Sequence, residues 1–373
     1  GQVRERLLKA SGITEQAARD NPHRLKWPQE GEPGVGLVDR YFGTTPLAAL
    51  LLTPVPLALT DRQRMEHTLI TAGSGHGKTQ TLQHLIVRDL TRPTGHEVGL
   101  VVIDSQGDLI GRIARLERLA RTDRLVLVDP TDIDHPPALN LFDLGGRASG
   151  TLSPREREQL LNATRELYLF VFGGVLGADF TAKQAGIFLP VIELMLSMPG
   201  ATILTLLKVM RDPSRFMGAI ERLPKLTRTF LTDRLQDKEF RQTRQQIEWR
   251  LNAVLMNGAF RRSFSAKANK VDLYQCLNAG KVVLINTAKE HLGEEGCRIF
   301  GRYMLALALK AAMDRARLPE ASRRTSFLYI DEAADYFDDT VARLLSQARK
   351  YNVGCVLAHQ ALEQMSDSLR DLV

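Results

Sequence analysis

From residue 67 onward, short apolar runs alternate with longer stretches of helical periodicity. The apolar runs predict strands at 67–71, 98–104, 125–129, 282–286, 327–331 and 353–358. Several are apolar almost without interruption, which is typical of strands buried on both faces of a parallel sheet. Helical patterns lie between them, including 80–90, 110–119, 297–315 and 339–350. This alternation predicts an α/β fold in which helices cover both faces of a mostly parallel sheet.

The stretch between 129 and 282 is too long for a single crossover connection. It predicts a series of helices at 154–171, 182–198, 202–210, 215–223, 226–233 and 240–256. We therefore expect an all-helical insert, residues 150–260. It would divide the α/β domain into a first part, 56–149, and a second part, 261–373.

Residues 1–55 are expected to form an irregular leading segment. Short helices are predicted only near 4–10 and 14–19, the second capped by Thr14. The segment 56–60 is predicted to be an edge strand entering the α/β domain, because proline is tolerated at edges and strand starts.

Most of the formal net charge of +7 comes from residues 211–262, the last part of the predicted insert and the two arginines after it. Residues 211–262 contain twelve Lys or Arg but only six Asp or Glu. Two interpretations stay open: a solvated helical surface, or a surface that faces nucleic-acid phosphates. Arg261, Arg262 and Lys270 extend the candidate contacts.

The cysteines and the apolar runs bear on the cellular setting. Cys276, Cys297 and Cys355 are scattered, which favours a reducing compartment over a disulfide framework or a zinc site. The apolar run 47–59 is interrupted by prolines and is too short to span a bilayer. We expect a cytoplasmic protein without a membrane segment. An anchor outside this sequence, holding it at the cytoplasmic face of the inner membrane, stays open.

One motif lies between the strand 67–71 and the helix 80–90, and reads Ala72-Gly73-Ser74-Gly75-His76-Gly77-Lys78-Thr79. It matches the G-x-x-x-x-G-K-[ST] pattern of a phosphate-binding loop, with Ala72 as a small residue in the first position. Glycines let backbone N–H groups converge on phosphate, and the helix N-terminus adds its positive dipole end. The predicted nucleotide-binding residues are Gly73, Ser74, Gly75, His76, Gly77, Lys78, Thr79 and Gln80.

Within this loop, Lys78 is expected to reach the β- and γ-phosphates, and the Thr79 hydroxyl to bind Mg²⁺. The His76 side chain is expected to face solvent or the edge of the nucleotide, and no chemical role is assigned to it.

A pair of acids, Asp331 and Glu332, ends the apolar run 327–331. Ligands gather at the carboxyl ends of parallel strands, so this pair is predicted to lie beside the phosphate loop. Asp331 would complete the Mg²⁺ shell, and Glu332 would orient or deprotonate the attacking water. Asp104 ends another strand and is ranked below Asp331, either as a residue near the nucleotide or as a helix cap.

Gln360 follows the last predicted strand, 353–358. It would sit beside the γ-phosphate and sense it, or it would only cap the strand. The residues alone leave both interpretations open.

Taken in order, these segments resemble the FtsK–HerA clan of ring ATPases, and within it the TraG/TraD-like coupling proteins of conjugation and type IV secretion. The resemblance covers about residues 56–373. It is carried by the loop at 72–79, Asp104-Ser105-Gln106-Gly107-Asp108-Leu109, Leu139-Asn140-Leu141-Phe142-Asp143, Asp331-Glu332, Ser346-Gln347-Ala348-Arg349-Lys350-Tyr351 and Ala358-His359-Gln360.

The resemblance implies a RecA-like P-loop NTPase core, assembled as a hexameric ring that pumps DNA on ATP hydrolysis. It also implies that Arg349 reaches the nucleotide of a neighbouring subunit. Coupling proteins usually carry N-terminal membrane helices, and this chain departs from them in that respect.

We therefore expect an ATPase that uses ATP and Mg²⁺ to move DNA, without sequence specificity, toward a type IV secretion or conjugation channel. Its catalytic residues would be Lys78, Glu332, Arg349 and Gln360, with Thr79 and Asp331 on the metal. Channel or relaxosome proteins are further candidate partners. Two alternatives stay open. One is a HerA-like motor that processes DNA or serves defence together with a nuclease. The other is a nucleotide-gated scaffold whose helical insert docks protein partners.

Overall fold

The computed structural model of the chain describes residues 1–54, 59–120, 122–143, 162, 164–173, 182–235, 237–336 and 348–360, with only the backbone of 182–185 and 239. The chain forms two compact units, Gly1–Leu59 and Thr60–Val373. Over the described residues, no helix is both long and apolar enough to cross a bilayer. All three cysteines are free thiols.

The first unit is built from short helices. They are α1 (Gln2–Ser11), α2 (Glu15–Asp20), the 3-10 turn η1 (Pro22–Arg24), α3 (Gly34–Phe42) and α4 (Pro46–Leu52). The helices expected near 4–10 and 14–19 are confirmed, but the expectation of an otherwise irregular segment is wrong. The two missed helices start after Pro33 and at Pro46, because proline begins a helix as readily as it marks a loop.

The edge strand expected at 56–60 is not found. Residues 56–58 lie outside the described residues, and Leu59 and Thr60 are not in a strand. Thr60 instead caps the helix α5 (Asp61–Arg64). Its hydroxyl accepts the Gln63 N–H at 3.3 Å, and the Gln63 side chain accepts the Thr60 N–H at 2.9 Å. This capping box makes Thr60 the N-cap of a helix instead of the last residue of a strand.

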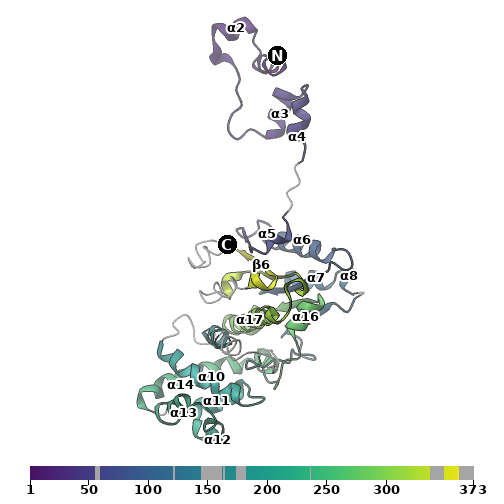
Figure 1. The fold of residues 1–373 in the computed structure, drawn as a ribbon. Coiled ribbons are helices and arrows are strands. Elements are labelled where there is room, and N and C mark those ends of the chain that lie inside the picture. Colours follow the sequence, from purple (N-terminus) through teal and green to yellow (C-terminus); the bar gives the residue numbers. More distant parts are fainter. Residues whose placement is uncertain are drawn as a thin grey trace. The chain divides into compact units, whose positions relative to one another are not determined.

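The second unit is organised around a sheet of six parallel strands (Figure 1). The strands are β1 (Thr68–Thr71), β2 (Gly99–Asp104), β3 (Leu125–Val128), β4 (Val282–Asn286), β5 (Ser326–Ile330) and β6 (Val353–His359). Their order is β1-β6-β5-β2-β4-β3, so β6 lies between the strand that leads into the phosphate loop and the strand that ends in the two acids. The six strands expected from the sequence are confirmed.

Each face of the sheet packs against its own set of helices. The core on one face contains Val101 and Ile103 of β2 together with α17 and the insert, whereas the core on the other contains Leu100 and Val102 with α6 and α7. This alternation follows from the two-residue period of a strand. The helices around the sheet are α6 (Lys78–Leu90), α7 (Asp108–Ala114), α8 (Glu117–Ala120), α16 (Leu273–Ala279) and α17 (Lys289–Asp314).

The helix expected at 110–119 is two helices, α7 and α8, and the chain leaves the helical path after Ala114. The first of them begins at Asp108, two residues earlier than expected, because the Asp104 side chain accepts N–H groups at the start of α7, as described below. The helix expected at 339–350 lies mostly outside the described residues; its last part belongs to the 3-10 turn η7 (Arg349–Tyr351). The remaining short turns are η4 (Arg315–Arg317), η5 (Glu320–Ser322) and η6 (Ala333–Asp335).

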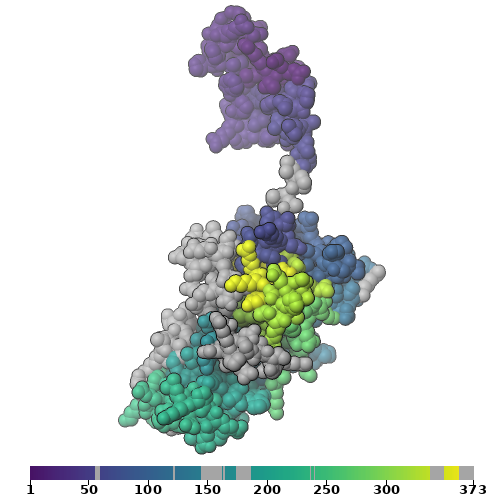
Figure 2. Space-filling model, in the orientation of Figure 1, coloured from purple at the N-terminus to yellow at the C-terminus, as the bar shows by residue number. Residues whose placement is uncertain are grey.

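Every described element between β3 and β4 is helical, in agreement with the predicted insert. Residues 164–173 are helical, and they are followed by α10 (Ala182–Ser197), α11 (Ile203–Arg211), η2 (Pro213–Phe216), α12 (Met217–Ile220), α13 (Lys225–Thr229), the π-helical turn η3 (Phe230–Arg234), α14 (Lys238–Met256) and α15 (Gly258–Ser263). In Figure 2 the insert forms the teal end of the second unit. Asn140, which is buried, joins it to the chain leaving the sheet: its amide donates to the carbonyls of Ala201 at 2.9 Å and Lys267 at 2.8 Å.

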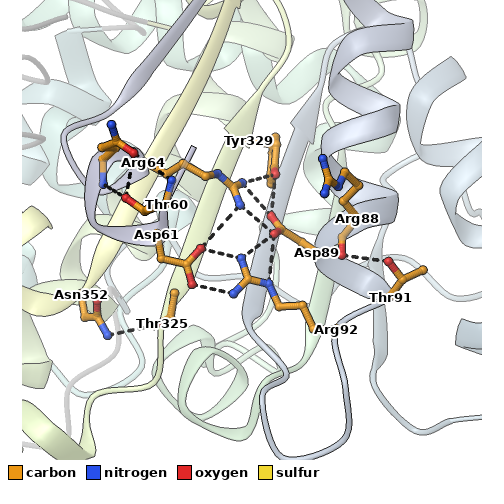
Figure 3. Close-up of polar contacts among 11 residues, drawn as sticks. Thr60, Asp61, Arg64, Arg88, Asp89, Thr91, Arg92, Thr325, Tyr329 and Asn352 are labelled. Carbon is orange, nitrogen blue, oxygen red and sulfur yellow. Dashed lines mark hydrogen bonds and ion pairs between the residues drawn. The ribbon is translucent and has the colours of Figure 1, made fainter. Parts of the chain in front are cut away.

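Two arginines and two aspartates form a buried ion cluster between α5, the end of α6 and β5 (Figure 3). Asp89 accepts both guanidinium arms of Arg64 at 2.8 Å and one arm of Arg92 at 2.8 Å. Arg92 also holds Asp61 through two bonds of 2.6 and 2.7 Å. The Tyr329 hydroxyl accepts from Arg64 at 2.7 Å and donates to Asp89 at 2.6 Å. The helix that follows the phosphate loop is thereby tied to the strand that carries the acids.

Candidate nucleotide-binding site

A pocket of about 330 Å³ lies at the carboxyl ends of the strands. Parallel α/β sheets bind their ligands at this edge. The pocket is lined by Gly73, Ser74, Gly75, Gly77, Lys78, Thr79, Gln80, Asp104, Ser105, Gln106, Asp108, Leu109, Arg112, Asp331, Glu332 and Gln360.

The phosphate loop has the backbone that its glycines permit. Gly75 has φ +78° and Gly77 has φ +83°, both in the left-handed region that side chains disfavour. Gly77 caps α6, so the first N–H groups of that helix, including those of Lys78 and Thr79, face the pocket without helical acceptors. Loop and helix together form a concave surface of donors suited to phosphate.

His76 differs from the other predicted loop residues because it does not line the pocket. Its Nδ1 lies 2.9 Å from the Ser74 carbonyl oxygen. The ring therefore donates to its own loop and helps to hold the turn. It was expected to face solvent or the nucleotide edge; the side chain is exposed, and its contact is structural.

Lys78, Asp331 and Glu332 meet although the acids lie about 250 residues further along the chain. The Lys78 Nζ atom lies 2.6 Å from Glu332 Oε2 and 3.4 Å from Asp331 Oδ1. The Thr79 hydroxyl donates to Asp331 Oδ2 at 3.3 Å. Glu332 has φ +54°, a left-handed conformation that is unusual for a glutamate and turns it out of the strand path.

The last residue of β6, His359, and the residue after it, Gln360, add two further groups to this cluster. Gln360 donates to Glu332 Oε2 at 3.0 Å, and His359 Nδ1 lies 2.8 Å from Glu332 Oε1. His359 is fully buried, and its Nε2 has no hydrogen-bond partner among the described residues. No role was predicted for His359 from the sequence, although its place at a strand end beside Gln360 was a usable signal. We call Lys78, Asp331, Glu332, His359 and Gln360 the acid–lysine cluster.

The environment of Glu332 keeps it ionised. Burial alone would raise its pKa, but the hydrogen bond and positive charge of Lys78 outweigh that effect, with smaller contributions from Gln360 and His359. The pKa of Glu332 is therefore lowered. Glu332 is a carboxylate near neutral pH, which is the form that a general base requires.

Asp104 accepts hydrogen bonds from the start of α7 and also lines the pocket, so the helix cap does not exclude a place near the nucleotide. Its Oδ1 accepts the Gln106 N–H at 3.0 Å, and its Oδ2 accepts the N–H groups of Leu109 at 3.0 Å and Ile110 at 3.3 Å. Burial raises its pKa, and these backbone bonds only partly offset the effect. Arg112, one turn further along α7, also lines the pocket and was not singled out from the sequence.

Arg349 does not line this pocket. It opens η7, at the amino end of β6, whereas Gln360 follows the carboxyl end of the same strand. A seven-residue strand spans about 20 Å. The Arg349 side chain is about half exposed and pairs with Glu66 at 3.0 Å. Arg349 therefore lies well away from the nucleotide pocket of the same chain.

The turn that carries Arg349 is firmly held. Arg323 donates to the Lys350 carbonyl at 2.7 Å, and the fully buried Arg315 donates to the Tyr351 carbonyl at 3.3 Å. Asn352, at φ +60°, donates its amide to the Arg323 carbonyl at 2.8 Å. These bonds fix the backbone of the turn, while the Arg349 side chain, paired with Glu66, stays about half exposed.

The residues present fit a nucleoside triphosphate with Mg²⁺. The loop offers N–H donors and the Lys78 ammonium for phosphate, and the 330 Å³ pocket lies directly beside them. Thr79 and Asp331 provide hard oxygen donors close together. Mg²⁺ is commonly held by one or two carboxylates together with substrate phosphates, and Asp331 with Thr79 would supply the protein's part of that donor set.

Comparison with solved structures identifies the fold. The chain superposes on the plasmid coupling protein TrwB in complex with ADP and Mg²⁺ with a TM-score of 0.59 at 15% identity, covering 87% of this chain and 74% of that chain. The TrwB complex with the ATP analogue ADPNP gives the same values. VirB4 of Thermoanaerobacter pseudethanolicus matches with a TM-score of 0.53 at 14% identity, covering 82% and 73%. No protein-family model and no curated protein sequence matches the chain. The predicted P-loop NTPase fold, with its parallel sheet and helical insert, is confirmed.

Proposed function

We propose that this chain is an ATP-hydrolysing motor that moves DNA toward a type IV secretion or conjugation channel. The observation that carries the proposal is the meeting of Lys78, Glu332 and Gln360 at one pocket. A phosphate loop alone would support any nucleotide-binding protein, whereas an acid and a glutamine beside it add what hydrolysis needs. Likeness of fold to TrwB and VirB4 supports the choice of a secretion-associated motor.

In this proposal the loop N–H groups and Lys78 bind the phosphates, and Thr79 and Asp331 hold Mg²⁺. The bound ion supplies charge neutralisation at the transferring phosphoryl group. Lys78 is paired with Glu332 at 2.6 Å, so reaching a phosphate requires it to exchange one anionic partner for another. That exchange frees Glu332 when the nucleotide binds.

Glu332 then orients the attacking water and takes its proton on a carboxylate oxygen. Its lowered pKa keeps the carboxylate available. His359 and Gln360 hold one oxygen each, so that the carboxylate keeps its orientation once Lys78 has left. Gln360, which contacts Glu332 and lines the pocket, serves as the sensor of the γ-phosphate.

We further propose that Arg349 acts on the neighbouring subunit in a hexameric ring. The exposed guanidinium on a rigid turn, distant from its own pocket, supports action in trans. An arginine supplied in trans is worth about 10³ to 10⁵ in rate. It would also make hydrolysis depend on assembly, because an isolated subunit lacks the group.

The deciding experiment is the ATPase rate measured against protein concentration, with single-stranded DNA, with duplex DNA and without DNA. A DNA-driven ring should show a specific activity that rises with concentration and increases further with DNA. A specific activity that is indifferent to both would refute the motor and favour the nucleotide-gated scaffold.

Mixing two inactive variants tests the role of Arg349. Arg349→Ala keeps an intact pocket, and Lys78→Ala keeps an intact arginine, so mixed rings contain some complete sites. We expect part of the activity to return on mixing. Mixed rings that are verified by mass and remain inactive would count against action in trans.

A further inference from the structure

The outward face of α14 carries an unusual set of side chains. A hollow of about 440 Å³ is lined by Gln242, Gln245, Gln246, Trp249 and Arg250, which we call the tryptophan–glutamine face. The Trp249 side chain is 72% exposed. The opposite side of the helix buries Thr243, Ile247 and Leu251, and this packing fixes which residues face outward. A large aromatic ring is therefore held in solvent at the centre of a polar surface.

The charges around this face are positive. Arg241 and Arg250 flank it, and neither forms an ion pair with a described residue. Glu248, the one acid of α14 whose side chain is described, is already paired with Arg211 at 2.9 Å. A polyanion at this face would therefore be attracted by the two arginines. Among the described side chains of α14, no unpaired carboxylate would repel it.

A flat aromatic ring, amides and arginines together match the chemistry of unpaired nucleic acid. Bases stack on aromatic rings, arginines contact the phosphates, and glutamines hydrogen-bond to base edges. Bases in a duplex are already stacked and would have to be unstacked first. The centre of a protein–protein interface is usually more apolar than this face, where three of the five lining residues are glutamines.

We infer that the tryptophan–glutamine face of α14 binds a single DNA strand, with a base stacked on Trp249 and phosphates near Arg241 and Arg250. The inference rests on the proposed DNA motor and adds the form of its substrate and a contact surface outside the nucleotide pocket. Of the two interpretations of the basic insert, it favours nucleic-acid contact.

The two tryptophans of the chain make a direct test available. In Trp27→Phe the only remaining tryptophan is Trp249, so its fluorescence reports on this face alone. Titration with oligo(dT) at low salt should quench the emission saturably, and added salt should reverse the quenching. Duplex DNA of equal length should quench much less. Equal quenching by the duplex would overturn the single-strand assignment.

Substitution then measures the stacking contact. Trp249→Ala should weaken oligo(dT) binding by about 5- to 150-fold, which corresponds to about 1–3 kcal/mol per stacked base. Trp249→Phe should retain much of the affinity. Trp27→Ala, an equivalent exposed tryptophan in the first unit, is the matched control and should bind like wild type. Basal ATPase activity without DNA should be unchanged in all three, because none touches the pocket.

The outcomes separate this inference from the proposed function. If DNA stimulates the ATPase but Trp249→Ala binds DNA like wild type, the inference is overturned and the motor stands. The face would then belong to a protein partner. If DNA neither binds nor stimulates hydrolysis, the proposed motor fails together with its contact surface.

Discussion

Two clusters of charged side chains lie on the same sheet, and they differ in how their charges are balanced. The buried ion cluster pairs two arginines, Arg64 and Arg92, with two aspartates, Asp61 and Asp89. The acid–lysine cluster has one permanent cation, Lys78, for two carboxylates, Asp331 and Glu332. Asp61 and Arg92 of the first reach a hollow of about 350 Å³, but Asp89 does not line it, whereas Lys78, Asp331 and Glu332 of the second all line the pocket of about 330 Å³.

The difference shows how charge near a sheet serves stability or chemistry. A saturated cluster, with each charge opposed and hydrogen-bonded, resists any change because removing one partner leaves another buried and uncompensated. An acid-rich cluster beside the N–H donors of the phosphate loop can bind a metal cation and a phosphate. Its lysine can also exchange the glutamate for a phosphate as its anionic partner. We therefore expect substitutions in the first cluster to affect folding and those in the second to affect turnover.

Glu332→Gln should produce the largest effect, and it should be on turnover. We expect the single-turnover rate of ATP hydrolysis to fall by about 10² to 10⁴ because the general base is lost. Binding of a fluorescent ATP analogue should be retained. Glu320→Gln, the same change on an exposed acid outside the pocket, is the control. Near-normal turnover in Glu332→Gln would refute the assigned role.

Asp89→Asn should instead destabilise the fold, by about 3–5 kcal/mol, since two arginines lose their shared buried partner. Urea unfolding of the second unit measures the loss. Asp61→Asn is the matched variant, because its half-exposed carboxylate bonds mainly to Arg92, and its cost should be about 1 kcal/mol. Equal costs for the two would mean that burial does not distinguish these aspartates.

Tyr329→Phe should have a smaller effect on the same cluster. Removing the hydroxyl takes one partner from Arg64 and one from Asp89 while preserving the ring, so we expect a loss of about 1–3 kcal/mol. Tyr351→Phe, on a half-exposed tyrosine, provides the comparison in the same urea experiment. A stability unchanged from wild type would show that the hydroxyl is dispensable in the cluster.

The smallest expected effect is the pH dependence of the Lys78–Glu332 pair. The pKa of Glu332 is lower in the folded chain than its ordinary value of 4.5. The pair therefore stabilises the fold fully above that value, and its contribution is lost as pH falls through the lower, folded-state pKa. The stability difference between wild type and Glu332→Gln should be constant near neutrality and shrink below pH 4.5. A difference that already shrinks near pH 6 would contradict a lowered pKa.

Local patterns in the sequence were sufficient for the elements and for the site's main residues. Apolar runs marked all six strands, and the glycine loop with Lys78 and Thr79 marked the start of α6. Asp331 and Glu332 could be singled out because they directly follow an apolar run, and the end of a parallel strand is a place for ligands. The helices α3 and α4 of the first unit were harder to predict, because proline and glycine at their starts also occur in loops.

The tertiary structure decided what depends on strand order and burial. β6 lies between β1 and β5, and for that reason His359 and Gln360 meet Glu332. Arg349 lies before β6 and Gln360 lies after it, so the length of this strand separates Arg349 from the nucleotide pocket. Asp89 and Arg64 look like surface residues in the sequence, yet both are buried in the folded chain. Periodicity and capping act over a few residues, whereas these contacts join segments up to about 280 residues apart, and only the folded sheet brings them together.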